Sequence, residues 1–477
     1  MVPAQEAAAL LARAVALHQQ GKLAEAQALY RQVLEGEPRQ FDALHMLGVI
    51  ENQQGRAAEA IRLIGAALAV NPAVADAHSH LGNALQAQQR FDDAVACYDR
   101  ALALAPAHVD ALLNRGSALR ALGRFGDALE DYARVLAMRP DHARALAFHG
   151  ACLKALKRNA EAIESYDRAL ALLPEDADLN NNRGNVLLEL GRFDDAVAAY
   201  ERALALRPEF AEAFSNRGNA QQELGRLNEA LASYDRALAL APGYADANAN
   251  RGTCLQKLGR LDDALAGYER ALALRPDFPE ALNNRGATLQ QLRRLGEALA
   301  SYDRAVALKP DYVEAHSNRG AALNLLKRFE EAVASYDRAL ALKPDYLVAK
   351  SNRGNALRDL GRHAEAAEEY AALLAMAPDS PFALGAEFHS RMQCCDWRGF
   401  ETRVQAIERE VLAGRDCSTP FIFLTVSDSA AAQLRCARTY VETSFPAAAP
   451  PASRVAGPAH ERIRVAYLST DLREHAV

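Results

Sequence analysis

Aromatic side chains are scarce in this chain of 477 residues: they make up 6% of it, and tryptophan occurs once. Because half of the residues are apolar, the core must be built mainly from Ala and Leu. No apolar run approaches the roughly 18 residues that a membrane-spanning helix needs. The N-terminus lacks a basic lead and carries Arg13 inside its apolar stretch, unlike a secretory signal. We therefore expect a cytoplasmic protein that does not interact with membranes.

Cysteine pairs with metal-site spacing and an excess of positive charge are also missing. The 7 cysteines are mostly far apart and form no CxxC pair, which argues against a disulfide framework and against a zinc site. The 55 Lys and Arg residues against 61 Asp and Glu residues give a net charge of -6. A chain with this balance has no bulk attraction to nucleic acid or to anionic lipid. We expect no metal, no cofactor and no nucleic-acid partner for this chain.

A regular proline spacing decides the organisation of the chain. Prolines recur every 34 residues from Pro38 to Pro378, and an Ala, a Tyr four residues after it and a Gly keep the same register. An internal period of this size indicates a solenoid of stacked helical hairpins. Within one period, the apolar spacing predicts helices over 211–224 and 227–240, separated by a turn at Gly225.

The recurring Gly, Ala, Tyr and Pro resemble the tetratricopeptide repeat over residues 5–378. The resemblance implies an all-α fold, a right-handed superhelix of about eleven repeats of 34 residues. It also implies that the first helices of the repeats line a concave groove.

A polar stripe follows the expected first helices. Seven repeats carry an asparagine two residues before the recurring Gly, and we call these the stripe asparagines. In most of these repeats the residue four positions earlier is acidic. The residue three positions later is often small and polar, as at Asn185, Asn219, Thr253 and Asn355. An asparagine both donates and accepts hydrogen bonds, so a row of them can hold the main chain of an extended or unfolded polypeptide without reading its sequence. The stripe asparagines are Asn114, Asn182, Asn216, Asn250, Asn284, Asn318 and Asn352, and the acids are Asp110, Asp178, Glu212, Asp246, Glu280 and Glu314.

Two alternatives compete with this interpretation of the stripe. Recent duplication is one, because SYDRALAL recurs almost verbatim, and the asparagine was then simply copied. Against it, Met46, His80 and Phe148 occupy the equivalent place, so the repeat does not require Asn there. The other alternative is a carboxylate clamp of the co-chaperone type, which needs Lys and Arg where this stripe carries acids.

The period fails after Pro378. We expect a helical junction over 379–445, with helices near 397–412 and 430–442, then a Pro/Ala linker over 446–461. The β-type run 463–468 predicts that 462–477 begins an incomplete α/β domain with its first strand.

The junction suggests a second family. CCDW (394–397), residues 419–434 and residues 462–477 resemble the stretch that joins tetratricopeptide repeats to the catalytic region in O-linked N-acetylglucosamine transferases, above all their bacterial SPINDLY-like relatives. The resemblance implies a UDP-GlcNAc donor, transfer to Ser or Thr hydroxyls, and His475 as an active-site residue with Asp471 in the same turn. Ala466 and Ala476 depart from the Gly and Pro usual there.

The sequence thus predicts a scaffold that recruits polypeptide substrates for a protein O-GlcNAc transferase. Because the chain includes only residues 462–477 of the catalytic part, we expect it to be inactive alone and to bind no UDP-GlcNAc. The alternatives are a free-standing scaffold without catalysis, an O-fucosyltransferase of the SPINDLY type, and a co-chaperone-like peptide receptor. Formation of a homodimer is left open.

Overall fold

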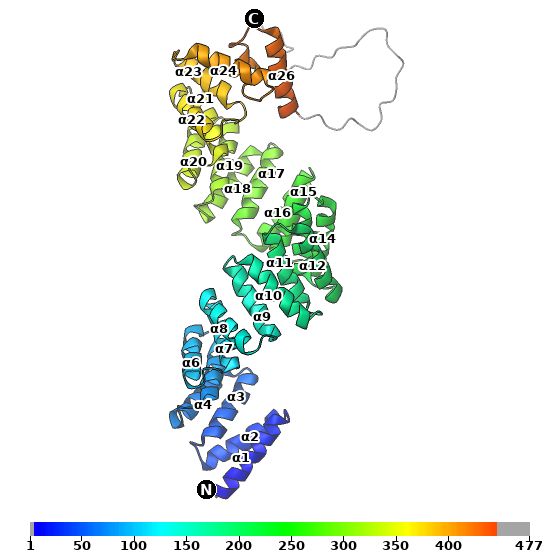
Figure 1. Cartoon of the computed structure of the whole chain (residues 1–477), viewed down its shortest axis with the longest axis vertical. Helices are drawn as coiled ribbons and strands as arrows, with labels where there is room; N and C mark the ends of the chain where they lie inside the picture. The colour runs from blue at the N-terminus through cyan, green and yellow to red at the C-terminus, as the bar shows by residue number, and fades with distance from the viewer. Residues whose placement is uncertain (1–3, 446–477) are drawn as a thin grey trace, which may run out of the picture. The chain divides into compact units, whose positions relative to one another are not determined.

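The computed structural model describes residues 4–445, which form 26 α-helices and no β-strand (Figure 1). Ten pairs of consecutive helices form antiparallel hairpins, from α1–α2 to α15–α16 and then α19–α20 and α21–α22, while α17 ends one compact unit and α18 begins the other. The expected all-α architecture is confirmed. The first helices of the hairpins are α1 (Ala4–Gln19), α3 (Phe41–Gln53), α5 (Ala75–Ala87), α7 (Val109–Ala121), α9 (Ala143–Ala155), α11 (Ala177–Glu189), α13 (Ala211–Glu223), α15 (Ala245–Lys257), α17 (Pro279–Gln291), α19 (Val313–Leu325) and α21 (Leu347–Asp359). The second helices are α2 (Leu23–Gly36), α4 (Ala57–Val70), α6 (Phe91–Leu104), α8 (Phe125–Met138), α10 (Asn159–Leu172), α12 (Phe193–Leu206), α14 (Leu227–Leu240), α16 (Leu261–Leu274), α18 (Leu295–Leu308), α20 (Phe329–Leu342) and α22 (His363–Met376).

The chain divides into two compact units, residues 1–292 and 293–477, and each is described by itself. Within each unit, every hairpin packs against the next one along the chain. The seventh hairpin has the helices expected over 211–224 and 227–240 to within one residue. Its turn contains Gly225 at φ +73°, a left-handed conformation that favours glycine.

In eight hairpins the two helices meet at a contact between a glycine and a tyrosine. A Cβ atom added to Gly218 on α13 would lie 2.7 Å from the ring of Tyr234 on α14. Tyr234 is fully buried and shares a cluster with Cys254 of the next hairpin. The recurring Gly therefore exists because the tyrosine ring occupies the space that a side chain would need. In the second hairpin Ile64 replaces the tyrosine against Gly48.

An arginine just before the recurring glycine links neighbouring hairpins by ion pairs. Arg115 forms two bonds to Asp131 of its own hairpin, at 2.8 Å from Nε and 2.5 Å from Nη2, and also pairs with Asp99 of the preceding hairpin. The same link to the preceding hairpin recurs in both units: Arg183–Asp167 at 2.5 Å, Arg251–Asp235 at 2.6 Å, Arg319–Asp303 at 2.6 Å and Arg353–Asp337 at 2.6 Å.

Beyond the repeats, the junction consists of α23 (Ala383–Gln393), α24 (Phe400–Leu412), α25 (Pro420–Phe423) and α26 (Ala430–Ser444). Phe388, Ile407 and Phe423 form the centre of its own small core. The helix expected from residue 397 begins later, because Gly399 adopts a left-handed φ of +63° at the N-cap. The helix expected over 430–442 is confirmed, and the Ser429 hydroxyl caps it by accepting from the Ala432 N–H.

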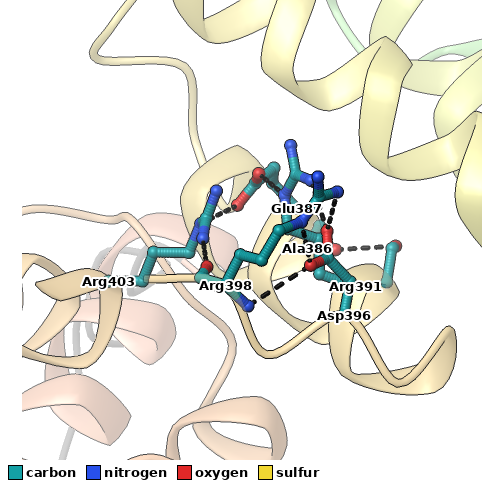
Figure 2. A network of polar contacts seen from close by, with 7 residues as sticks. Ala386, Glu387, Arg391, Asp396, Arg398 and Arg403 are labelled. Carbon is teal, nitrogen blue, oxygen red and sulfur yellow. Dashed lines mark hydrogen bonds and ion pairs between the residues drawn. The ribbon is translucent and has the colours of Figure 1, made fainter. Parts of the chain in front are cut away.

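A polar network fixes the first two junction helices. Figure 2 shows the carboxylate of Glu387 between the guanidinium groups of Arg391 and Arg403. Asp396 receives bonds from Arg398 and Arg391, and these two hydrogen bonds hold the pKa of its carboxyl well below the usual range. The network ties the loop after α23 to both helices, and its two arginines Arg391 and Arg403 neutralise the nearly buried carboxylate of Glu387.

The linker 446–461, the strand expected over 463–468 and His475 lie outside the described residues. Among residues 4–445, no helix is long and apolar enough to cross a membrane.

Candidate functional site: the asparagine stripe

The seven stripe asparagines lie at the same position of seven first helices, and all are half-buried. Five belong to the first unit, on α7, α11, α13, α15 and α17, and Asn318 and Asn352 belong to the second, on α19 and α21. In the first unit several of them bond to the preceding hairpin, so the stripe is built into the stacking of the hairpins.

A three-residue relay links successive hairpins at the stripe. Asn219, just after the recurring glycine of its hairpin, accepts with Oδ1 from the hydroxyl of Tyr234 at 2.8 Å and from Nδ2 of Asn250 in the next hairpin at 3.0 Å. Asn83 does the same for Tyr98 at 2.7 Å and Asn114 at 2.9 Å. With a hydroxyl in place of the amide, Thr253 bonds to Tyr268 at 3.1 Å and to Asn284 at 3.4 Å. We call each such trio a Tyr–Asn–Asn relay.

The relays centred on Asn83 and Asn219 each leave one donor group and one acceptor unused. In the relay of Thr253, by contrast, the Asn284 Oδ1 accepts from Asn283 at 3.3 Å and the Thr253 hydroxyl bonds to the Ala249 carbonyl. In the described part of the chain, nothing accepts from Nδ2 of Asn83 or Asn219, and nothing donates to Oδ1 of Asn114 or Asn250. None of these atoms is buried without a partner, so all of them can reach solvent. Rotating both amides of a relay exchanges their roles but still leaves one donor and one acceptor. That pair is complementary to the C=O and N–H of a peptide unit.

The first relay opens onto a hollow in the surface. A depression of about 370 Å³ is lined by Asn83, Gln86, Ala87 and Asn114. Both asparagines of the relay therefore face a concave space that an extended chain can enter.

The other stripe asparagines are held differently. Nδ2 of Asn216 donates to Asn181 at 3.1 Å, and Asn181 donates to the carboxylate of Glu212 at 3.2 Å. In the hairpins that precede Asn182 and Asn352, the residue after the recurring glycine is an alanine, so the central acceptor of a relay is missing. The spacing of the sequence therefore gives a regular row of asparagines, whereas the hydrogen bonding between hairpins is regular only where that acceptor is present.

Two acids of the stripe form ion pairs with arginines of their own hairpins. Asp178 pairs with Arg207 at 2.6 Å and Asp246 pairs with Arg275 at 2.5 Å, each with the cation that ends the second helix of its own hairpin. Glu212, Glu280 and Glu314 are exposed in the first turns of α13, α17 and α19. Some of the negative charge expected along the stripe is thus neutralised, while Glu314 and Asp110 leave theirs facing solvent.

Two aromatic positions interrupt the stripe. Phe148 lies under two guanidinium groups, with Arg120 at 4.9 Å and Arg144 at 5.2 Å from the ring centre. His80 bonds through Nδ1 to Nε2 of His45 at 2.8 Å. Burial and the neighbouring His80 lower the pKa of His45 from 6.5 to about 4. In the first unit the stripe position is therefore occupied by His80 and Phe148 as well as by asparagines.

The sequence pattern did not single out Asn83 or the tyrosine hydroxyls. Asn83 belongs to a hairpin with His80 at the stripe position, so no Asn-Arg-Gly motif marks it. A polar residue after one glycine and an asparagine two residues before the next mark Asn83 and Asn114. The same pattern occurs at Asn185 and Asn216, where Asn216 bonds to Asn181 instead, so the pattern alone does not identify a relay. Among the described residues, no group of three His, Cys, Asp or Glu side chains could hold a metal ion.

Models of the tetratricopeptide repeat match the chain from residue 11 to residue 380 with hardly a break. The matched segments are 11–77, 53–108, 81–149, 152–191, 184–225, 211–244, 233–266, 254–292, 294–326, 313–346 and 349–380. The chain belongs to the tetratricopeptide-repeat family. The tetratricopeptide resemblance of the sequence is thereby confirmed, and no curated protein matches the chain.

Several solved tetratricopeptide structures are similar to parts of the chain. YrrB, a TPR protein with an unusual peptide-binding site, is 28% identical over 39% of this chain and 96% of its own, with a TM-score of 0.33. MamA is 26% identical over 36% of this chain and 94% of its own, with a TM-score of 0.34. The APC/C hetero-tetramer Cut9–Hcn1 is 15% identical over 81% of this chain and 97% of that chain, with a TM-score of 0.46.

Proposed function

We propose that the chain is a protein-binding scaffold whose stripe of asparagines holds the main chain of an extended or unfolded polypeptide. The observation that carries this proposal is the unused donor and acceptor of the Tyr–Asn–Asn relays centred on Asn83 and Asn219. The relay fixes both amides by hydrogen bonds inside the scaffold, so little side-chain entropy is lost when a peptide binds. Because peptide units are the same in every polypeptide, recognition of this kind is insensitive to sequence.

Affinity accumulates over several hairpins. A hydrogen bond contributes about 0.5–1.5 kcal/mol net, so one relay alone binds weakly and several in register bind usefully. The exposed carboxylates of Asp110 and Glu314 favour basic or hydroxyl-bearing side chains beside the main chain. A carboxylate clamp would need cations at these positions instead.

We expect replacement of four stripe asparagines to weaken this binding strongly. The variant carries Asn→Ala at 216, 250, 284 and 318, and it removes side chains that are half-buried and lie on four successive first helices. At about 0.5–1 kcal/mol for each lost contact, affinity for a fluorescein-labelled polar peptide of about 20 residues falls by at least about 30-fold. Fluorescence anisotropy measures the affinity, and circular dichroism shows an unchanged helical content.

Asn228→Ala is the matched control, because Asn228 is exposed on the second helix α14. It should leave the affinity unchanged. If the four-site variant binds the peptide as well as the unaltered protein does, the stripe is not the binding surface.

We further propose that the scaffold recruits polypeptide substrates for a protein O-GlcNAc transferase. The support is the likeness of residues 394–397 and 419–434 to the junction of those enzymes, in a segment that packs as a small helical unit of its own. In this role UDP-GlcNAc is used by the catalytic lobes of the transferase, in the cytoplasm, and the repeats deliver Ser- or Thr-containing segments. Hydrolysis of UDP-GlcNAc by this chain alone would contradict that division of roles.

A free-standing scaffold, or an arm of a SPINDLY-type O-fucosyltransferase, remains the alternative within the same proposal. All three roles use the asparagine stripe in the same way and differ in what receives the bound polypeptide. Homodimer formation through the repeats is compatible with each of them.

A further inference from the structure

The surface of the first two hairpins is apolar where later hairpins carry the stripe. A pocket of about 670 Å³ lies between α1, α2 and α3, lined among others by Leu11, Val15, Tyr30 and Met46. Met46 stands two residues before the recurring glycine Gly48, which is the stripe position. The pocket therefore belongs to the same face of the first helices as the asparagines.

One polar group in this pocket has no partner. Tyr30 has no solvent-exposed surface, and its hydroxyl makes no hydrogen bond. In the hairpins with a relay, the equivalent hydroxyl bonds to a polar side chain of the first helix, but here Val15 occupies that position. Burial, followed by the nearby charge of Asp42, raises the pKa of Tyr30 to about 12, so the group is a neutral O–H donor.

A buried donor without an acceptor costs free energy unless a ligand completes it. The pocket thus combines apolar walls, which favour an aliphatic or aromatic side chain, with the unpaired donor of Tyr30, which favours a carbonyl oxygen beside that side chain; His18 and Gln19 also line it. A peptide residue offers both groups together. Asp42, exposed at the rim, adds a preference for a basic neighbour.

We propose that this pocket binds an apolar side chain of the same polypeptide that the stripe holds, with the Tyr30 hydroxyl donating to a peptide carbonyl of that polypeptide. This inference rests on the proposed function and adds a specificity to it: clients carry an apolar anchor residue near one end of the segment that binds the stripe. The main-chain contacts of the stripe then supply affinity for any sequence. The pocket determines which residues of the bound polypeptide lie along the stripe.

The test uses matched synthetic peptides and the full chain. The first peptide contains Gly, Ser, Thr and Lys only, and the others carry one Leu near the N-terminal or the C-terminal end. Burying a Leu side chain contributes enough to tighten binding about tenfold, and we expect that gain for one of the two placements. Fluorescence anisotropy gives the three dissociation constants.

Two substitutions separate the parts of the pocket. Met46→Asn gives the second hairpin the residue of the later stripe, and it should abolish the tenfold gain from Leu while the all-polar peptide binds as before. Tyr30→Phe removes the hydroxyl and keeps the ring, and it should weaken the Leu peptide by roughly 3–10-fold. Because its hydroxyl is unpaired, Tyr30→Phe leaves the melting temperature unchanged or raised, whereas Tyr234→Phe, which loses the bond to Asn219, lowers it.

The outcomes distinguish this inference from the proposed function. Equal binding of all three peptides, with the four-site Asn→Ala variant still impaired, overturns the pocket and leaves the stripe intact. Self-association of the chain that Met46→Asn abolishes, without any preference for Leu, overturns it in favour of a second copy as occupant. A Leu preference that persists in Met46→Asn and in Tyr30→Phe overturns it as well. If none of the three peptides binds, the proposed function fails together with the inference.

Discussion

Gly218→Ala is expected to lower the free energy of unfolding by about 1–3 kcal/mol, because the added methyl group would overlap a ring that has no space to move. Its Cβ atom would lie 2.7 Å from Cε1 of Tyr234, which is fully buried between two hairpins. Alanine has a higher helix propensity than glycine, so propensity alone would predict that Gly218→Ala stabilises the protein. The loss therefore reports the packing of the glycine against the tyrosine.

Two other glycines provide an internal comparison. A Cβ atom at Gly150 would meet the ring of Tyr166 at 3.2 Å, so Gly150→Ala should cost less than Gly218→Ala. At Gly126, in the first turn of α8, nothing lies within 4 Å, and Gly126→Ala should be neutral or stabilise the protein by up to about 0.5 kcal/mol. Urea unfolding followed by circular dichroism measures all three. Equal effects at the three sites would show that the glycine–tyrosine contact does not set the spacing of the helices.

Arg115→Met is expected to destabilise the protein by about 3–5 kcal/mol, because it leaves a buried carboxylate without its cation. The Asp131 side chain is 1% exposed and receives two bonds from Arg115, whose pKa these bonds raise. Arg115 also pairs with Asp99 of the preceding hairpin, so its removal weakens a hairpin and its stacking together.

The double variant Arg115→Met with Asp131→Leu should recover most of that loss, since it removes the buried charge as well. Arg124→Met is the control: Arg124 pairs with Asp127 at 2.6 Å on the surface, and its removal should cost less than about 0.5 kcal/mol. If Arg115→Met and Arg124→Met cost the same, the buried pair does not hold the hairpins. Denaturant unfolding of the four proteins gives the comparison.

The repeat architecture could be predicted from the sequence because its signal is redundant. Pro38, Gly218, Tyr234 and their equivalents recur in one register, and the two helices of the seventh hairpin end within one residue of the expected bounds. The close approach of glycine and tyrosine could also be inferred, since small and large residues alternate between the two helices.

The details of the site could not be predicted, because they depend on contacts between hairpins. The relay needs a residue after one glycine to face an asparagine about 31 residues further on, as in Asn219 and Asn250. The ion pairs of two stripe acids were not predicted either: Arg207 and Arg275, at the end of the second helices, neutralise Asp178 and Asp246. The unpaired hydroxyl of Tyr30 is visible only once Val15 is seen at the position from which Asn83 and Asn219 accept in their hairpins.

The most direct test of the asparagine stripe replaces main-chain amides rather than protein side chains. An all-polar peptide is compared with a scrambled version of itself and with an analogue in which alternate amides are esters, which lack the N–H donor and accept more weakly. Main-chain recognition predicts that scrambling changes the dissociation constant by less than about threefold, whereas the esters weaken binding by more than about tenfold. Equal binding of the amide and the ester peptides, or a strong effect of scrambling, would contradict it.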